Sequence, residues 1–103
     1  MHTSIAQRRA DIAALCRRYG VRQLEIFGSA ARGVDFDPAT SDADFLVLFG
    51  GIDDIGPLEQ FFGFAEALEH LLGRTVDLVE SNAVENPFLL AEIDRAREVV
   101  YAA

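Results

Sequence analysis

The amino-acid sequence predicts an α+β fold, α/β-like, in which helices pack on a small β-sheet. Segments with helical and with strand-like apolar spacing alternate along the chain, and glycine or proline separates most of them. Half of the 103 residues are hydrophobic and a quarter are charged, which is the composition of a globular core. A chain of this length holds about one domain, so we predict a single domain over residues 1–103.

Eight elements follow one another in this prediction. They are a helix over 4–19, a strand over 21–27, a short helical turn over 29–33, a strand over 42–49, a helix over 57–72, a strand over 75–80, a helix over 87–96 and a short strand over 99–101. Gly20 suits the end of the first helix, because glycine readily adopts the left-handed conformation of a C-cap. The first strand ends at Gly28, and Ser29 is a typical residue at the start of a helical turn.

The second half of the chain carries the clearest signals. The run of Phe, Leu and Val within 42–49 is typical of a buried strand. Pro57 and Gly73 are the expected start and stop of the long helix, and Asn86 before a proline starts the next one. The apolar stripe expected on the long helix consists of Leu58, Phe61, Phe62, Ala65, Leu68, Leu71 and Leu72. Phe64 lies off this stripe, so it faces either a partner or a second packing surface.

Charge and cysteine content narrow the classes of function. The chain has 17 acidic and 9 basic residues, a net charge of -8, whereas a protein that binds nucleic-acid phosphates directly needs a basic face. We therefore expect no direct nucleic-acid binding, and an acidic surface suits a basic protein partner. The single cysteine, Cys16, forms no internal disulfide, which fits a cytoplasmic protein. No stretch approaches the roughly 18 apolar residues of a membrane span, so no membrane association is expected.

Two acidic residues stand at the head of the strand over 42–49. Because side chains alternate along a strand, Asp42 and Asp44 point to the same face with Cα atoms roughly 6.6 Å apart, and Ala43 points away. Two carboxylates this close repel each other, and a divalent cation relieves the repulsion. Full exposure to water relieves it too, so the pair alone leaves both interpretations open.

A third acid, Asp77, lies between two apolar residues of the strand over 75–80. An unpaired carboxylate is costly to bury. This residue therefore either takes part in a cation site or turns to water together with Thr75.

Gly28-Ser29 lies where the first strand meets a helical turn. Glycine lets the backbone approach a phosphate closely, and the N-terminus of a helix offers free N–H groups to it. The same pair is also common in ordinary turns. If the first two strands run antiparallel, this phosphate cradle lies beside Asp42 and Asp44.

Taken in order, three motifs resemble the signature of the minimal nucleotidyltransferases of the DNA polymerase beta superfamily. They are Gly28-Ser29-Ala30-Ala31-Arg32-Gly33, then Ser41-Asp42-Ala43-Asp44-Phe45, then Asp77. The resemblance extends from the first helix to Tyr101. It implies the nucleotidyltransferase fold, a small mixed β-sheet with helices packed on it.

The resemblance implies catalysis with two Mg2+ ions and ATP as the substrate. Asp42 and Asp44 would bind the ions that the triphosphate shares. Asp77 would complete the second metal site and orient the attacking hydroxyl or accept its proton. These three aspartates are the predicted catalytic residues and metal ligands.

The same resemblance assigns nucleotide-binding roles. Gly28 and Ser29 would hold the outer phosphates, while Arg32 would contact a phosphate or simply be a solvated helix residue. The chain departs from the family pattern in two places, the small side chain of Ala43 and a longer segment over 34–40. The longer segment bears on how the triphosphate is covered.

Minimal members of this family typically act as antitoxins of HEPN ribonuclease toxins. The resemblance implies a type VII-like antitoxin that transfers AMP from ATP to a tyrosine of a HEPN-family toxin and forms a hetero-oligomer with it. Two alternatives stay open: a non-catalytic antitoxin that neutralises the toxin by binding alone, and nucleotidyl transfer to a small molecule. Clustered acids favour the enzyme, since a binding module gains nothing from their repulsion, and we expect no substrate domain for a small molecule.

Overall fold

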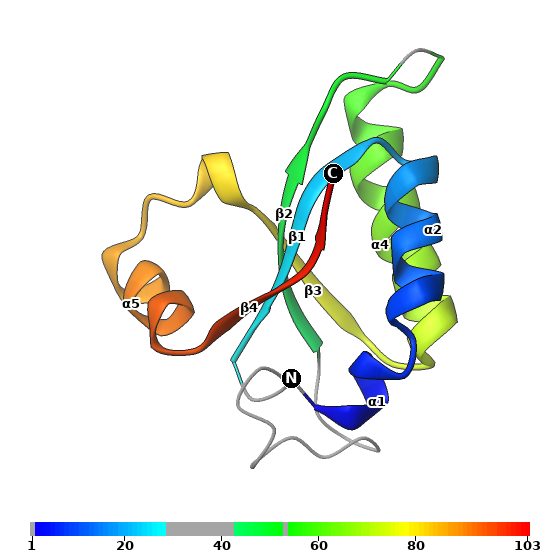
Figure 1. Cartoon of the computed structure of the whole chain (residues 1–103). Helices are drawn as coiled ribbons and strands as arrows, with labels where there is room; N and C mark the ends of the chain where they lie inside the picture. The colour runs from blue at the N-terminus through cyan, green and yellow to red at the C-terminus, as the bar shows by residue number, and fades with distance from the viewer. Residues whose placement is uncertain (1, 29–42, 53) are drawn as a thin grey trace.

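The computed structural model describes residues 2–28, 43–52 and 54–103, which build a four-stranded sheet with helices on both faces (Figure 1). The strands are β1 (Val21–Phe27), β2 (Ala43–Phe49), β3 (Val76–Glu80) and β4 (Arg97–Ala102), in the order β3-β2-β1-β4. β1 is antiparallel to both β2 and β4, whereas β2 and β3 are parallel. The predicted α+β fold with a small mixed sheet is therefore confirmed.

The helices divide unequally between the two faces of the sheet. Their bounds are α1 Thr3–Ala6, α2 Arg9–Arg18, α4 Pro57–Leu72, the 3-10 helix η1 Ser81–Ala83 and α5 Pro87–Arg95. α2 and α4 lie side by side on one face, and α5 lies on the other (Figure 1). In the part of the chain that the structure describes, no helix combines the length and the apolar character that crossing a membrane requires.

The N-terminal region differs from the predicted single helix, because a turn at Gln7 and Arg8 separates α1 from α2. Ile5 and Ile12 are both buried in the same core. Between them the chain places polar side chains where the next turn of a continuous helix would need an apolar one. The turn lets each helix present its own isoleucine to the core.

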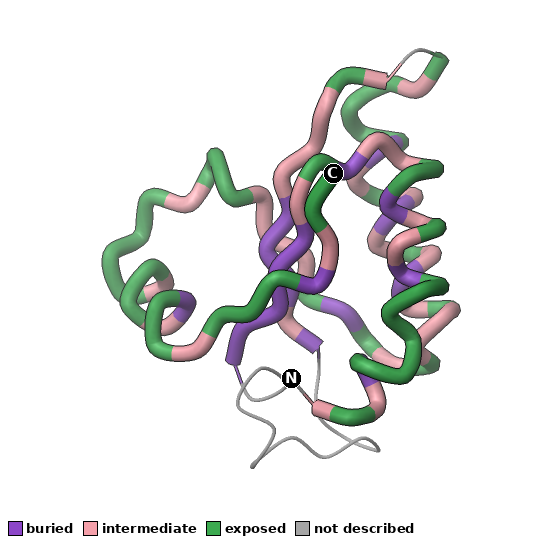
Figure 2. Tube along the Cα trace, in the orientation of Figure 1, coloured by how far each residue is buried: buried purple, intermediate pink, exposed green. Residues whose placement is uncertain are grey.

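Two clusters of buried side chains stabilise the sheet, one on each face. The larger cluster joins α2 and α4 to the sheet and includes Cys16 of α2. The smaller consists of Phe27, Leu46 and Ile93, and joins the sheet to α5. Figure 2 shows the buried residues along the strands and on α2 and α4, while most of α5 is exposed.

The long helix α4 is rotated relative to the predicted stripe. Its buried residues are Gln60, Phe64 and Leu68. The hypothesis that Phe64 faces a partner is wrong, since its side chain is fully buried in the larger core. Leu58 and Phe62, both assigned to the stripe, are instead 73% and 62% exposed.

Candidate active site

The parallel pairing of β2 and β3 brings Asp44 and Asp77 together. In the register of these strands the two aspartates are direct partners. Neighbouring strands lie about 4.8 Å apart and paired residues project from the same face, so both carboxylates belong to the face that carries α5. Asp44 is half-buried and Asp77 is exposed. Ala43 points the other way, as predicted, and is fully buried in the larger core.

Gly28 lies directly against the carboxylate of Asp44. The antiparallel pairing of β1 and β2 sets Phe27 opposite Asp44, so the end of the first strand lies beside the start of the second, as expected. A Cβ added to Gly28 would lie 2.7 Å from Oδ2 of Asp44. The backbone of Gly28 also has a φ of 71°, which favours glycine. This position therefore needs glycine for its conformation and for its contact.

The remaining predicted site residues lie outside the described residues: they are Ser29, Arg32 and Asp42, together with the longer segment over 34–40. Within the ranges 2–28, 43–52 and 54–103, no three His, Cys, Asp or Glu side chains gather as a metal site. The described part of the predicted site is thus the pair Asp44 and Asp77 with Gly28 beside it.

The described site residues fit a divalent cation and a phosphate. Carboxylate oxygens are hard ligands of the kind that Mg2+ prefers. Like charges that are direct partners in a sheet repel each other, so a cation held between Asp44 and Asp77 would be favourable. The missing side chain at Gly28 lets the carboxylate of Asp44 lie directly against the end of β1. A glycine backbone at this point can also come close to a phosphate.

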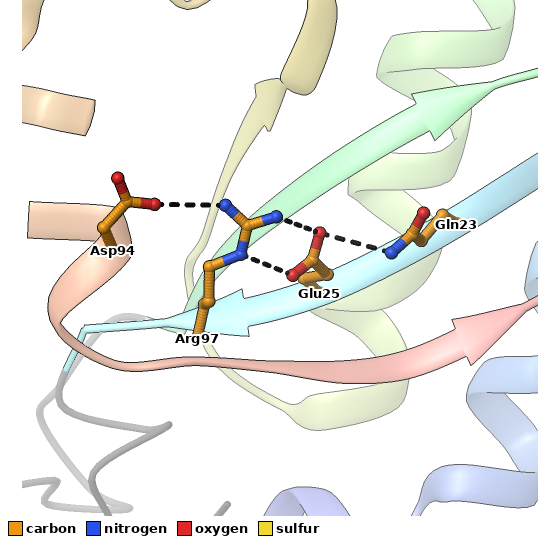
Figure 3. Close-up of polar contacts among 4 residues, drawn as sticks. All are labelled: Gln23, Glu25, Asp94 and Arg97. Atoms are coloured by element: carbon orange, nitrogen blue, oxygen red, sulfur yellow. Dashed lines mark hydrogen bonds and ion pairs between the residues drawn. The ribbon is translucent and has the colours of Figure 1, made fainter. Parts of the chain in front are cut away.

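A charged network that the sequence analysis missed lies on the same face of the sheet (Figure 3). Arg97 donates from Nε to Oε2 of Glu25 at 2.8 Å and from Nη2 to Oε1 at 3.1 Å. Its Nη1 donates to Oδ1 of Asp94 at 3.2 Å. Gln23 donates from Nε2 to Oε1 of Glu25 at 3.4 Å. The hydrogen bond to Glu25 and the negative charge of Glu25 raise the pKa of Arg97.

One signal in the sequence pointed to this network. Glu25 interrupts an apolar strand between Leu24 and Ile26, which is the same cue that singled out Asp77. Glu25 is only 7% exposed, so its charge needs a partner within the fold.

Strand pairing aligns the network with the aspartates. Phe27 is the partner of Asp44 on one side and of Arg97 on the other. Since Asp77 pairs with Asp44, one row of residues runs across the four strands from an exposed carboxylate on β3 to a guanidinium on β4.

The mixed sheet and the paired carboxylates beside a glycine define a class of protein, the nucleotidyltransferases. The chain matches the model of the nucleotidyltransferase domain over residues 12–100, and it belongs to this family. The resemblance to the minimal nucleotidyltransferases and the predicted class of enzyme are thereby confirmed.

Individual relatives agree with this assignment. The protein adenylyltransferase MntA of Thermococcus cleftensis is 39% identical over 87 residues, which cover 84% of this chain and 80% of the relative. A Methanocaldococcus jannaschii relative, also named as a protein adenylyltransferase, is 38% identical over 80 residues, covering 78% and 76% of the two chains. A solved minimal nucleotidyltransferase has a TM-score of 0.72 and 32% identity over 95% of both chains. A toxin-antitoxin structure with AMP-PNP, at 22% identity and a TM-score of 0.68 over 92% and 73%, shares the fold.

Proposed function

We propose that this protein is a Mg2+-dependent antitoxin that transfers AMP from ATP to a tyrosine of a HEPN-family ribonuclease toxin. The observation that carries the proposal is the direct pairing of Asp44 with Asp77, with Gly28 against the carboxylate of Asp44. The names of the relatives support protein adenylylation. Among the structural neighbours, one toxin-antitoxin structure holds AMP-PNP and another a tri-AMPylated Shewanella oneidensis HEPN toxin bound to an MNT antitoxin.

Different residues of this chain would bind the metal ions and the phosphates during the transfer. When bound, Mg2+ neutralises charge on the triphosphate and lowers the pKa of the attacking hydroxyl. Asp44, with Asp42, would hold the ions, while Gly28 and Ser29 would hold the outer phosphates. Arg32 would add a contact to a phosphate.

Asp77 is suited to the acceptor side of the reaction. It lies on β3, an edge strand of the sheet, and its side chain is exposed, so an incoming protein can reach it. Its carboxylate would orient the tyrosine hydroxyl and take its proton as the hydroxyl oxygen attacks the α-phosphorus and pyrophosphate leaves. The net charge of -8 would favour encounter with a basic, RNA-binding toxin in the cytoplasm.

The test is the intact mass of the cognate HEPN toxin after incubation with this protein, Mg2+ and ATP. We expect a gain of one or more AMP units, and a loss of transfer by Asp77→Asn of about a hundredfold or more, since a positioned proton acceptor typically contributes that much. Asp54→Asn is the matched control, because Asp54 is also exposed and lies beyond the far end of β2. Its φ of 72° is one that asparagine adopts as well.

Two results would redirect the proposal. A tight complex without any gain of mass would favour neutralisation by binding alone. Neither a complex nor a gain of mass would favour a small-molecule acceptor.

A further inference from the structure

A cavity of about 240 Å³ lies between the sheet, η1 and α5. One part of its lining is polar and comes from Gln23, Glu25 and Arg97. The other part is apolar and includes Leu46 and Leu90. The cavity is therefore an amphipathic slot that borders the charged network of Figure 3.

The cavity lies on the same sheet face as the paired aspartates and one step along the strands from them. Leu46 follows Asp44 by two residues on β2, and Glu25 precedes Phe27 by two residues on β1. Two residues of extended strand correspond to roughly 6.6 Å. Gly28, at the end of β1, lies on the opposite side of Asp44 from the cavity.

We propose that this cavity binds the purine base of the ATP substrate, an inference that rests on the proposed function. A nucleotide with its outer phosphates near Gly28 and its α-phosphate near Asp44 directs its ribose and base along the strands toward Leu46. The outer phosphates, the α-phosphate and the base of a nucleotide thus follow one another in the same order as Gly28, Asp44 and the cavity.

The chemistry of the lining suits a purine. The edge of adenine offers an amino group as donor and ring nitrogens as acceptors. The carboxylate of Glu25 can accept a hydrogen bond from the amino group, and the side chains of Arg97 and Gln23 can donate hydrogen bonds to the ring nitrogens. The flat faces of the ring would contact Leu46 and Leu90.

The polar part of the lining is held in place before any ligand binds. Arg97 donates three hydrogen bonds, two to Glu25 and one to Asp94, so its guanidinium is fixed from two sides. Prior ordering of this kind lowers the entropic cost of binding. An ion pair between a buried carboxylate and a half-exposed guanidinium is weak evidence of a role in stability. A role in recognition accounts for its place at the cavity.

The test compares binding of ATP, CTP and inorganic tripolyphosphate, each with Mg2+, by calorimetry. Leu90→Trp narrows the cavity from α5, where Leu90 is 42% exposed and a larger side chain can be accommodated. We expect this variant to bind ATP at least about tenfold more weakly and tripolyphosphate as the wild type does. We also expect the wild type to prefer ATP over CTP by about tenfold or more. Phe88→Trp is the matched control, because Phe88 is 85% exposed on the same helix and does not line the cavity.

The outcomes separate this inference from the proposed function. Unchanged ATP binding by Leu90→Trp, an equal loss for ATP and tripolyphosphate, or equal binding of ATP and CTP by the wild type would each overturn the base site and leave nucleotidyl transfer intact. A wild type that binds neither ATP nor tripolyphosphate would overturn the proposed function, and the base site with it. Far-UV circular dichroism of each variant confirms that binding is compared between folded proteins.

Discussion

At Gly28 the lack of a side chain makes room for the carboxylate of Asp44. We predict that Gly28→Ala lowers the free energy of unfolding by about 1–2 kcal/mol, because its φ of 71° is unfavourable for alanine. We also expect AMP transfer to fall by about tenfold or more, because the new Cβ would meet Oδ2 of Asp44 at 2.7 Å and displace it. Chemical denaturation and the toxin mass assay measure the two effects.

Gly51→Ala serves as the control for this variant. A Cβ at Gly51 meets no atom within 4 Å, so we expect neither stability nor transfer to change appreciably. Equal behaviour of the two alanine variants would show that the close approach at Gly28 has no consequence.

The sequence predicted some residues of the candidate site and missed others. Asp44, Asp77 and Gly28 each break a local pattern of apolar or helical residues, and the motif order ties them together. The partnership of Glu25 with Arg97 spans 72 residues of sequence. Only the pairing of β1 with β4 brings these two residues together, and no local sequence pattern predicts that pairing.

At the scale of secondary-structure elements, Gln60 links three of them. Its Nε2 atom donates to the carbonyl oxygen of Tyr19 at 2.8 Å and to that of Gly50 at 3.1 Å, which ties α4 to the end of α2 and to the end of β2. We predict that Gln60→Leu lowers the free energy of unfolding by about 1–3 kcal/mol, because two carbonyl oxygens lose their donor. Urea denaturation measures this loss.

The matched control is Gln7→Leu. Gln7 is exposed in the turn between α1 and α2, and a substitution there should change stability by no more than about 0.5 kcal/mol. A loss of stability by Gln60→Leu no larger than that of the control would mean that the amide does not hold the three elements together.

The helices and strands were predicted from the sequence only in part, and Gln60 marks one of the differences. The order of strands and of the longer helices followed from apolar spacing and from glycine and proline positions, and it is correct for the described residues. The face that α4 buries was predicted in part. Leu68, Leu71 and Leu72 pack in the larger core as the stripe requires, whereas the polar Gln60 takes a buried position and Phe62 is exposed. β4 begins at Arg97, earlier than the predicted 99–101, since its hydrogen bonds with β1 extend the strand across polar residues that carry no strand signal.

At the scale of the whole molecule, the pH dependence of folding should report on the larger core. Cys16 is fully buried in this core, between α2 and the sheet, and burial raises the pKa of its thiol from 9.0 to about 12, although the charge of Arg17 opposes the shift. Between these values the unfolded chain loses the thiol proton and the folded chain keeps it. Stability from this group is therefore fully present below pH 9.0 and is lost as the pH rises toward about 12.

We predict that the free energy of unfolding of the wild type falls by on the order of 2 kcal/mol more than that of Cys16→Ala between about pH 8 and about pH 10.5. Urea titrations at the two pH values give both quantities. Cys16→Ala is the reference because it removes the thiol and keeps every other titrating group. Parallel pH profiles for the two proteins would show that the thiol ionises without opening the core.

The two faces of the sheet have different tasks in the molecule as a whole. The face under α2 and α4 holds most of the buried apolar side chains. The other face carries the smaller cluster under α5, the cavity and the paired aspartates. Under the proposed function, substitutions on the second face would change nucleotide binding while the larger core still supports the fold.

The parallel arrangement of β2 and β3 affects the stage of folding at which Asp44 and Asp77 come together. Parallel neighbours need a long crossover, here supplied by α4, so Asp44 and Asp77 meet only after that helix has docked and β3 has joined the sheet. Contacts between residues so distant in sequence form slowly, because the intervening chain must close first. In a nascent or partly unfolded chain, Asp44 and Asp77 are therefore both present but do not yet lie side by side. Competence for chemistry would arrive as one of the last events of folding.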